Sequence, residues 1–348
     1  MRVVPAQLPA AAADLVGRED DLAEIESRLS GPTPRGAAPI VMITGAPGTG
    51  KTAVAVRSAQ RVSARYAAGQ LCAELGGSTN RPARAHSILD GFLRAIGIPT
   101  AAIPPEPAER SKLFRSWSAG QPLLLFLDDV ASADQVAALL PAFEGCAIIA
   151  TSRFPCIPFG QLVPLAALSL GDGINLLARA VGVDRIAAEP AAAGSIVRGC
   201  DRLPLAINAA GARLAAEPSR PLWHLAASLA DVSHRLAELR VAGFDVLAAC
   251  EANFHALGEQ ERAALRALST VPDGRLTSAE AAALLDCTDE VADSLLARLI
   301  AGHVLVVTQD DGDRPASYAF LALGHSHART RQADGHTLPG RAIPNTPR

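Results

Sequence analysis

The sequence predicts a parallel α/β domain in its first half and a mostly helical region in its second half. Short apolar runs alternate with helix-like segments as far as about residue 165, and polar or glycine-rich turns follow these runs. From about Ser169 onward, helical segments broken by prolines dominate. Alternation of strands and helices is typical of a parallel sheet that is covered by helices on both faces.

Composition narrows the classes of protein that this chain can represent. A length of 348 residues suits two or three domains, and 49% hydrophobic residues are enough to form cores. A net charge of −3 argues against a dedicated nucleic-acid-binding protein. The six cysteines show no C-x-x-C spacing, which argues against a zinc site or a disulfide framework. No apolar run approaches the roughly 20 residues of a membrane helix. We therefore expect a cytoplasmic protein without a membrane partner.

The expected elements of the first half follow the hydrophobic pattern. Leu22, Ile25 and Leu29, for example, have helical spacing, whereas the run LLLFL at residues 123–127 is continuously apolar, as in a buried parallel strand. The predicted strands are residues 39–44, 71–75, 123–127 and 146–150, and the predicted helices are 20–29, 52–66, 85–96, 108–118 and 133–140.

The second half divides into a helical domain and a winged-helix-like domain. Helices are predicted at 244–255, 259–269, 278–285 and 290–300, with strands at 303–308 and 317–321 as a two-stranded wing. The predicted organisation is a linker at 1–18, a nucleotide-binding domain at 19–165, a helical domain at 166–240, a winged-helix-like domain at 241–323 and a disordered tail at 324–348. The tail is assigned because it has no apolar periodicity and many polar residues.

A phosphate-binding loop is the strongest functional signal. Residues 45–52 read GAPGTGKT, which satisfies the Walker A pattern between a predicted strand and a predicted helix. The glycines allow backbone N–H groups to face a phosphate, the Lys51 ammonium reaches the β- and γ-oxygens, and the Thr52 hydroxyl ligates Mg²⁺. The chain has only two lysines, and one of them is Lys51. The predicted nucleotide-binding residues of this loop are Gly45, Ala46, Gly48, Thr49, Gly50, Lys51, Thr52 and Ala53.

Charged residues at two other strand ends complete the predicted site. Asp128 and Asp129 close the strand at 123–127, at the carboxyl edge where open α/β sheets bind ligands. We expect Asp128 to hold Mg²⁺ and Asp129 to orient or deprotonate the attacking water. Arg153 follows the next strand and is expected to contact the γ-phosphate. Lys51, Asp129 and Arg153 are thus the candidate catalytic residues.

The ordered motifs resemble a known family. The segments LVGRE at 15–19, the P-loop, LLLFLDDV at 123–130, IIATSR at 148–153 and CDRLPLAI at 200–207 follow one another as in NB-ARC signalling ATPases of the STAND class. The chain is particularly similar to the ATPase region of actinobacterial AfsR-type regulators. The resemblance implies that Val16, Gly17 and Arg18 frame the adenine and ribose, that Pro204 packs on the adenine, and that ATP or ADP is the ligand.

The resemblance also implies a function, with one departure. Such proteins are switches in which ADP holds a closed state and ATP exchange exposes a surface for a partner or for self-association, with slow hydrolysis and a role in transcriptional regulation. The family's winged-helix His is missing from the stretch 318–323, and His325 or His327 could replace it only with a shift in register.

Two other functions stay open at the level of sequence. One is a fast ATPase of the AAA+ kind, and the other is a regulator that binds DNA through its winged helix. The helix at 290–300 would enter the major groove. This helix and the residue before it carry three acidic side chains, Asp289, Glu290 and Asp293, and only one basic side chain, Arg298. Because carboxylates repel phosphates, DNA binding through this chain alone is not expected.

Overall fold

A computed structural model describes residues 3–12, 15–31, 37–79, 81–158, 160–309 and 317–334. The chain forms two compact units. The first contains residues 1–45 and 49–166, and the second contains residues 46–48 and 167–348. Among the described helices, none has the length and apolar content that crossing a bilayer requires.

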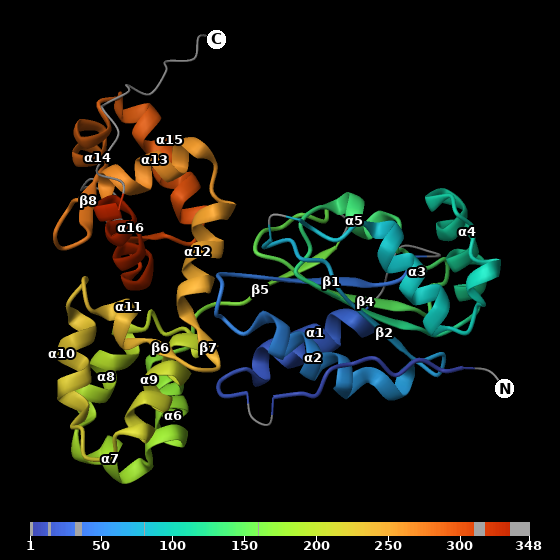
Figure 1. Cartoon of the computed structure of the whole chain (residues 1–348), viewed down its shortest axis with the longest axis horizontal. Helices are drawn as coiled ribbons and strands as arrows, with labels where there is room; N and C mark the ends of the chain where they lie inside the picture. Colours follow the sequence, from blue (N-terminus) through green and yellow to red (C-terminus); the bar gives the residue numbers. More distant parts are fainter. Residues whose placement is uncertain are drawn as a thin grey trace. The chain divides into compact units, whose positions relative to one another are not determined.

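The first unit is built on a parallel five-stranded sheet (Figure 1). The pairing of its strands gives the order β2-β3-β4-β1-β5. The strands are β1 (Ile40–Thr44), β2 (Gln70–Glu74), β3 (Leu124–Asp128), β4 (Ala147–Thr151) and β5 (Gln161–Pro164). Every residue of β1 and β4 is buried, which explains why these strands read as continuous apolar runs. The sequence did not predict β5, because it has four residues of which only Val163 is buried.

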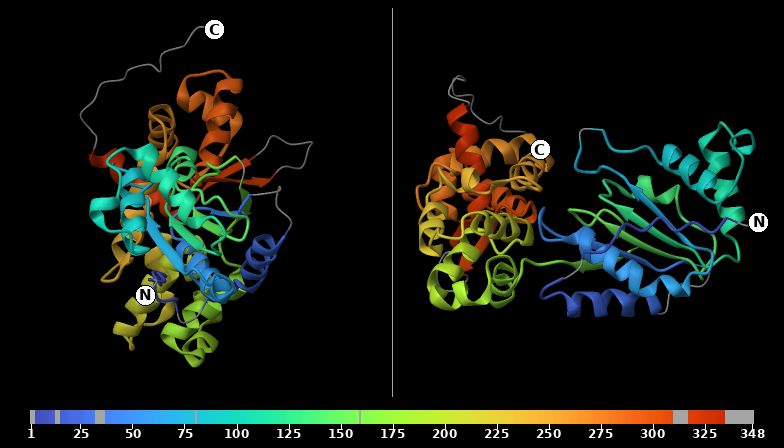
Figure 2. Two further views of the ribbon diagram at one scale, coloured as in Figure 1. Left: turned by 90° about the vertical axis from the view of Figure 1, so that its right-hand side faces the viewer. Right: turned by 60° about the horizontal axis from the view of Figure 1, so that its bottom comes forward.

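Helices cover both faces of this sheet, as Figures 1 and 2 show. They are α1 (Glu19–Ser30), α2 (Lys51–Val62), α3 (Ala85–Ala95), α4 (Pro107–Ser118) and α5 (Ala133–Ala137), with short 3₁₀ turns at Ser63–Arg65 and Thr100–Ala102. The buried residues of α1 and α2 pack on one face of the sheet, and those of α3, α4 and α5 pack on the other. The predicted parallel α/β fold is therefore confirmed for this part of the chain.

The N-terminal segment lies along the outer edge of the sheet at β2. Ala6 forms a parallel bridge with Gln70, whose N–H donates to the carbonyl of Pro5 over 2.7 Å. The Gln7 side chain also accepts a hydrogen bond from the N–H of Cys72 at 3.1 Å. These contacts occupy backbone groups that an uncovered edge strand would leave without partners.

The second unit begins with a helical bundle. Its elements are α6 (Leu170–Val181), α7 (Val183–Ala188), α8 (Pro190–Gly199), α9 (Pro204–Ala216), α10 (Leu222–Ala230) and α11 (Arg235–Glu238). One apolar core joins these helices, and alanines and glycines of α8 and α9 are fully or almost fully buried within it. A small hairpin of β6 (Arg240–Val241) and β7 (Phe244–Asp245) follows the bundle.

The same unit continues with helices and a three-stranded antiparallel sheet in the order β8-β10-β9. Its elements are α12 (Val246–Ala256), α13 (Glu259–Leu268), β8 (Arg275–Thr277), α14 (Ser278–Leu285), α15 (Asp289–Ala301), β9 (Leu305–Gln309), β10 (Ser317–Phe320) and α16 (Ala322–Asp334). The sequence predicted two strands in this region, and the structure adds β8, a three-residue strand too short to show a pattern.

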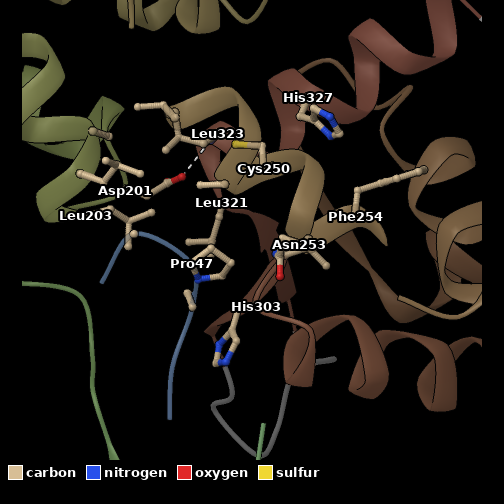
Figure 3. Close-up of a pocket in the computed structure, with 18 of the residues that line it drawn as sticks. Pro47, Asp201, Leu203, Cys250, Asn253, Phe254, His303, Leu321, Leu323 and His327 are labelled. Atoms are coloured by element: carbon tan, nitrogen blue, oxygen red, sulfur yellow. Dashed lines mark hydrogen bonds between the residues drawn. The ribbon is translucent and has the colours of Figure 1, made fainter. Parts of the chain in front are cut away.

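Helix α16 corrects the prediction of a disordered tail from residue 324. Residues 324–334 are helical, while 335–348 lie outside the described residues. The buried face of α16 includes His325, Ser326 and His327, so the helix lacks the apolar period that reveals a helix in a sequence. Its first N–H groups, on Ala322 and Leu323, donate to the Asp201 carboxylate at 2.6 and 2.8 Å. Figure 3 shows Asp201 beside Leu323. A residue remote in sequence thus supplies the cap of this helix.

Candidate nucleotide-binding site

The loop between β1 and α2 has the backbone shape that the Walker A pattern requires. Gly45, Gly48 and Gly50 all have positive φ angles, of 148°, 83° and 93°. At Gly45 a side chain is also excluded by space, because a Cβ would lie 2.5 Å from the carbonyl oxygen of Leu165. The loop therefore depends on glycine for both its conformation and its packing.

Lys51 lies at the first turn of α2 and points back across the loop. Its Nζ donates a hydrogen bond to the carbonyl of Gly45 at 2.9 Å. Burial and then the positive charge of Arg153 lower the pKa of Lys51, against the opposing effects of Asp129 and Asp128, and the resulting pKa is about 8. A buried ammonium close to a second cation is stabilised by any anion that enters the loop.

The two predicted magnesium ligands are in direct contact. The Thr52 hydroxyl donates to the Asp128 carboxylate, with distances of 2.9 and 3.1 Å to its two oxygens. A second hydroxyl, that of Thr151 at the end of β4, donates to Asp128 Oδ1 at 2.5 Å. Hydroxyl and carboxylate oxygens are the ligands that Mg²⁺ prefers, so this donor set fits the metal.

Asp129 occupies a constrained position beside Asp128. Its φ angle of 54° is left-handed, which aspartate tolerates better than most residues. Its N–H donates to the Thr151 hydroxyl at 2.9 Å, and its Oδ2 accepts the N–H of Ser78 at 2.7 Å. Main-chain and side-chain contacts together fix the direction of this carboxylate at the carboxyl edge of the sheet.

Arg153 follows β4 at the same edge and is only 8% exposed. Burial lowers its pKa, and the negative charge of Asp129 partly opposes this effect. The preceding Ser152 hydroxyl donates to the carbonyl of Val130 at 2.8 Å, which anchors the turn that carries Arg153. A half-buried lysine, a buried arginine, two carboxylates and a glycine loop thus meet at one edge, a combination that fits a phosphate chain with a divalent cation.

The residues predicted to contact the adenine and ribose lie outside the phosphate-binding loop. Val16 and Gly17 form a turn in which Gly17 has a φ angle of 64°. The guanidinium of Arg18 is buried and contacts backbone carbonyls within the first unit. Pro204 is the first residue of α9 in the second unit. The adenine contacts of these residues stay predictions.

The remaining predicted loop residues also have defined positions. Thr49 is buried, Ala53 lies in the first turn of α2, and Ala46 and Gly48 belong to residues 46–48, which are grouped with the second unit.

The two histidines considered as substitutes for the family's winged-helix His are both buried in α16. His325 Nε2 lies 3.1 Å from the carbonyl oxygen of Ser269, and its ring stacks on Phe320. His327 packs edge-on against the Phe254 ring, with a distance of 5.6 Å between ring centroids. Both rings are therefore part of the packing of the second unit.

Sequence reasoning missed Thr151 and Ser78. Thr151 is the first residue of the Thr-Ser-Arg motif, from which only Arg153 was selected. Because β3 and β4 are adjacent, with Leu127 opposite Ala150, Thr151 is brought opposite Asp128. That adjacency was not deducible from spacing in the sequence. Ser78 contributes a backbone N–H, for which side-chain patterns give no signal.

Comparison with known proteins relates most of the chain to bacterial regulators. It is 38% identical over 328 residues to the regulatory protein AfsR of Streptomyces griseus, and 36% identical over 331 residues to AfsR of Streptomyces coelicolor. Each alignment covers 93% of this chain and 33% of AfsR. The resemblance to AfsR-type regulators is confirmed. The chain spans about a third of the length of these curated relatives.

Two further findings concern the fold. Residues 14–144 match the family model described as AAA ATPase domain, which includes the loop and both aspartates. The structure is similar to that of the ORC2 protein of Aeropyrum pernix, solved as ADPNP and ADP complexes, with a TM-score of 0.57 and 15% identity. That match covers 94% of this chain and 97% of ORC2. At this level of identity the similarity concerns the fold alone.

Proposed function

We propose that this chain is an ATP- and ADP-binding switch of the NB-ARC type, with slow ATP hydrolysis and a role in transcriptional regulation. The single observation that carries the proposal is the pairing of the half-buried Lys51 with the glycine loop at the carboxyl edge of the sheet, beside the buried Arg153. An AAA ATPase domain match over residues 14–144, which include the loop and Lys51, supports nucleotide binding. The similarity to AfsR supports a regulatory role.

The residues of the site have distinct roles in this proposal. Lys51 and the loop N–H groups bind the phosphates, and Arg153 contacts the terminal phosphate. Thr52 and Asp128 hold Mg²⁺, which when bound neutralises charge that develops on the phosphate oxygens. Asp129 orients the attacking water and accepts its proton. Because Asp129 Oδ2 is already bound to the N–H of Ser78, this carboxylate is a restrained base, consistent with slow turnover.

Choice of nucleotide is assigned to residues outside the loop. Pro204 would pack on the adenine, and the turn at Val16 and Gly17 would frame the ribose side. A rigid apolar ring loses little conformational entropy when it packs against a base. These roles rest on the family resemblance.

The second unit is proposed to change its contacts when ATP replaces ADP. We assign residues 166–240 to a helical domain and 241–323 to a winged-helix-like domain, with α13, α14 and α15 beside the sheet β8-β10-β9. A nucleotide shifts such an equilibrium only if it binds the two states with different affinity. The partner in this proposal is a protein or a second copy of the chain.

Nucleotide content tests the proposal. The purified protein would be denatured and the released nucleotide identified by chromatography. We expect ADP at close to one molecule per chain, and hydrodynamic radii that differ between the ADP and ATP forms. No released nucleotide, together with no binding of added ADP or ATP, would overturn the proposal.

An actively hydrolysing AAA+-type ATPase is the alternative, and the AAA ATPase domain match favours it. The two proposals predict different kinetics. A switch shows less than about one turnover per minute, whereas enzymes commonly turn over about 1–1,000 times per second. Steady-state phosphate release, together with the mass of the ATP-bound assembly, separates them.

A further inference from the structure

Arg18 is buried at the start of α1. It follows the left-handed turn at Gly17 and is 5% exposed. Helix α1 is held against the sheet by the fully buried Leu22 and Ile25. Since the helix position is set by this apolar face, the point at which the Arg18 side chain leaves the backbone is fixed.

The guanidinium of Arg18 joins two segments that lie far apart in the sequence. Its Nη2 donates to the carbonyl of Thr49 at 2.9 Å and to the carbonyl of Ala166 at 2.8 Å. Its Nη1 forms an ion pair with Asp21 at 3.1 Å, which orients the group. One nitrogen therefore holds two backbone segments together.

The two carbonyls belong to different segments of the first unit. Thr49 lies in the phosphate-binding loop, two residues before Lys51. Ala166 ends the first unit, after β5. The preceding residue also touches the other end of the loop, because the Leu165 N–H donates to the carbonyl of Thr44 at 2.7 Å and its carbonyl fills the space where a Gly45 side chain would lie. Leu165 thus contacts the start of the loop directly, and Ala166 is linked to Thr49, near its end, through Arg18.

We propose that Arg18 is a positioning residue that couples the phosphate-binding loop to residues 165–166, the segment through which the first unit continues into the second. The inference rests on the proposed nucleotide binding and gives Arg18 a role different from the adenine and ribose contact that the family resemblance implies. When a nucleotide draws the loop N–H groups around its phosphates, the Thr49 carbonyl moves with them. Arg18 transmits this movement to Ala166.

Two variants and one control test this role. Arg18→Lys keeps the charge but lacks the planar fork that holds Asp21 and both carbonyls together. Arg18→Ala removes all three contacts. Arg28→Lys changes a half-exposed arginine of α1, whose partner is Glu24. ADP affinity is measured by calorimetry, and hydrogen–deuterium exchange of residues 165–168 is measured with and without saturating ADP.

We expect ADP to slow exchange at residues 165–168 at least about threefold in the parent and in Arg28→Lys. Arg18→Ala is expected to bind ADP about tenfold more weakly, with Arg18→Lys between it and the parent, because charge-assisted hydrogen bonds hold the loop. In both Arg18 variants the protection at 165–168 is lost even at saturating ADP. If Arg18→Ala shows no cooperative unfolding, Arg18→Lys carries the test.

Parent-like ADP affinity in Arg18→Lys, or undiminished protection at 165–168 in that variant, would overturn this inference. Either result would leave the proposed function standing, because the parent still binds ADP. Failure of the parent itself to bind ADP would instead overturn the proposed function.

Discussion

The Thr151 hydroxyl donates a hydrogen bond to the Asp128 carboxylate over 2.5 Å, and it simultaneously accepts the N–H of Asp129. One side chain at the end of β4 therefore orients both acidic residues at the end of β3. The predicted magnesium ligand and the predicted base are fixed by a residue on the neighbouring strand.

Replacing Thr151 tests this arrangement. Thr151→Val removes the donor to Asp128 and leaves the Asp129 N–H without its acceptor, so the free energy of unfolding should fall by about 1–3 kcal/mol. Magnesium affinity in the presence of ADP should fall several-fold. Thr151→Ser, which retains the hydroxyl, should restore most of both. Denaturant unfolding and a Mg²⁺ titration measure these effects, and equal values for the Val and Ser variants would contradict the role of the hydroxyl.

The two lysines provide a matched pair of variants. Lys51→Ala should weaken ADP binding about 100-fold or more, because the ammonium makes charge-assisted contacts with the phosphates. Lys112→Ala should change the affinity less than about twofold, since Lys112 is exposed and pairs with Glu109 at 2.8 Å. Calorimetry with each purified variant checks this prediction. Wild-type affinity in Lys51→Ala would show that the loop does not bind phosphate.

Asp128→Asn should separate nucleotide binding from magnesium binding. The amide keeps the size of the side chain but loses the charge that attracts Mg²⁺. We expect ADP affinity without metal to stay within about threefold of the parent, whereas magnesium-dependent phosphate release should disappear. Release at the parental rate would remove Asp128 from the metal site.

The buried His327 predicts a pH dependence of stability. Burial, followed by the charge of Arg331, lowers the pKa of His327 to about 4 from an unfolded value near 6.5. Between these values the unfolded chain binds a proton that the folded chain does not. Because of His327, the free energy of unfolding therefore decreases as pH falls from 6.5 to 4, by up to about 1.4 kcal/mol per pH unit.

His327→Phe should remove this slope. The pH dependence of this variant must be compared with that of the parent, because Asp201 changes the free energy of unfolding with pH in the opposite direction. Burial raises the pKa of Asp201 to about 6. The contribution of Asp201 to the free energy of unfolding therefore decreases as pH rises from about 4 to 6. Unfolding curves at several pH values for the parent and His327→Phe provide the measurement. Parallel curves for the two proteins would contradict the assignment to His327.

The exposed face of α15 predicts that this chain does not bind DNA through that helix. Asp289, Glu290 and Asp293 are exposed there, and Arg298 pairs with Glu261 at 2.6 Å. Labelled 30-base-pair duplexes should show no anisotropy change at about 150 mM salt. Binding at that salt that Arg298→Ala abolished would contradict this view of the face.

The sequence was most informative where a function requires particular residue types. Gly45, Lys51 and Thr52 were identified because a phosphate needs bare backbone, an ammonium and a hydroxyl in a fixed order. Buried strands were found because both of their faces are apolar. Strand β5 was missed because three of its four residues are not buried.

Long-range polar contacts escaped prediction. The acceptors of Arg18 lie 31 and 148 residues away in the sequence, so no local pattern indicates them. Helix α16 was missed for a related reason, because its cap, Asp201, lies 121 residues before Ala322. Its buried face also carries two histidines in place of an apolar stripe.

The N-terminal segment that borders β2 has a consequence for the solubility of the protein. Pro5 and Gln7 take up the N–H groups of Gln70 and Cys72 on the outermost strand. In a chain shortened to begin at Ala10, those groups would face solvent as a template for intermolecular strand pairing. A short N-terminal segment, remote in sequence from the residues of the nucleotide site, would then decide whether the protein stays monodisperse or aggregates.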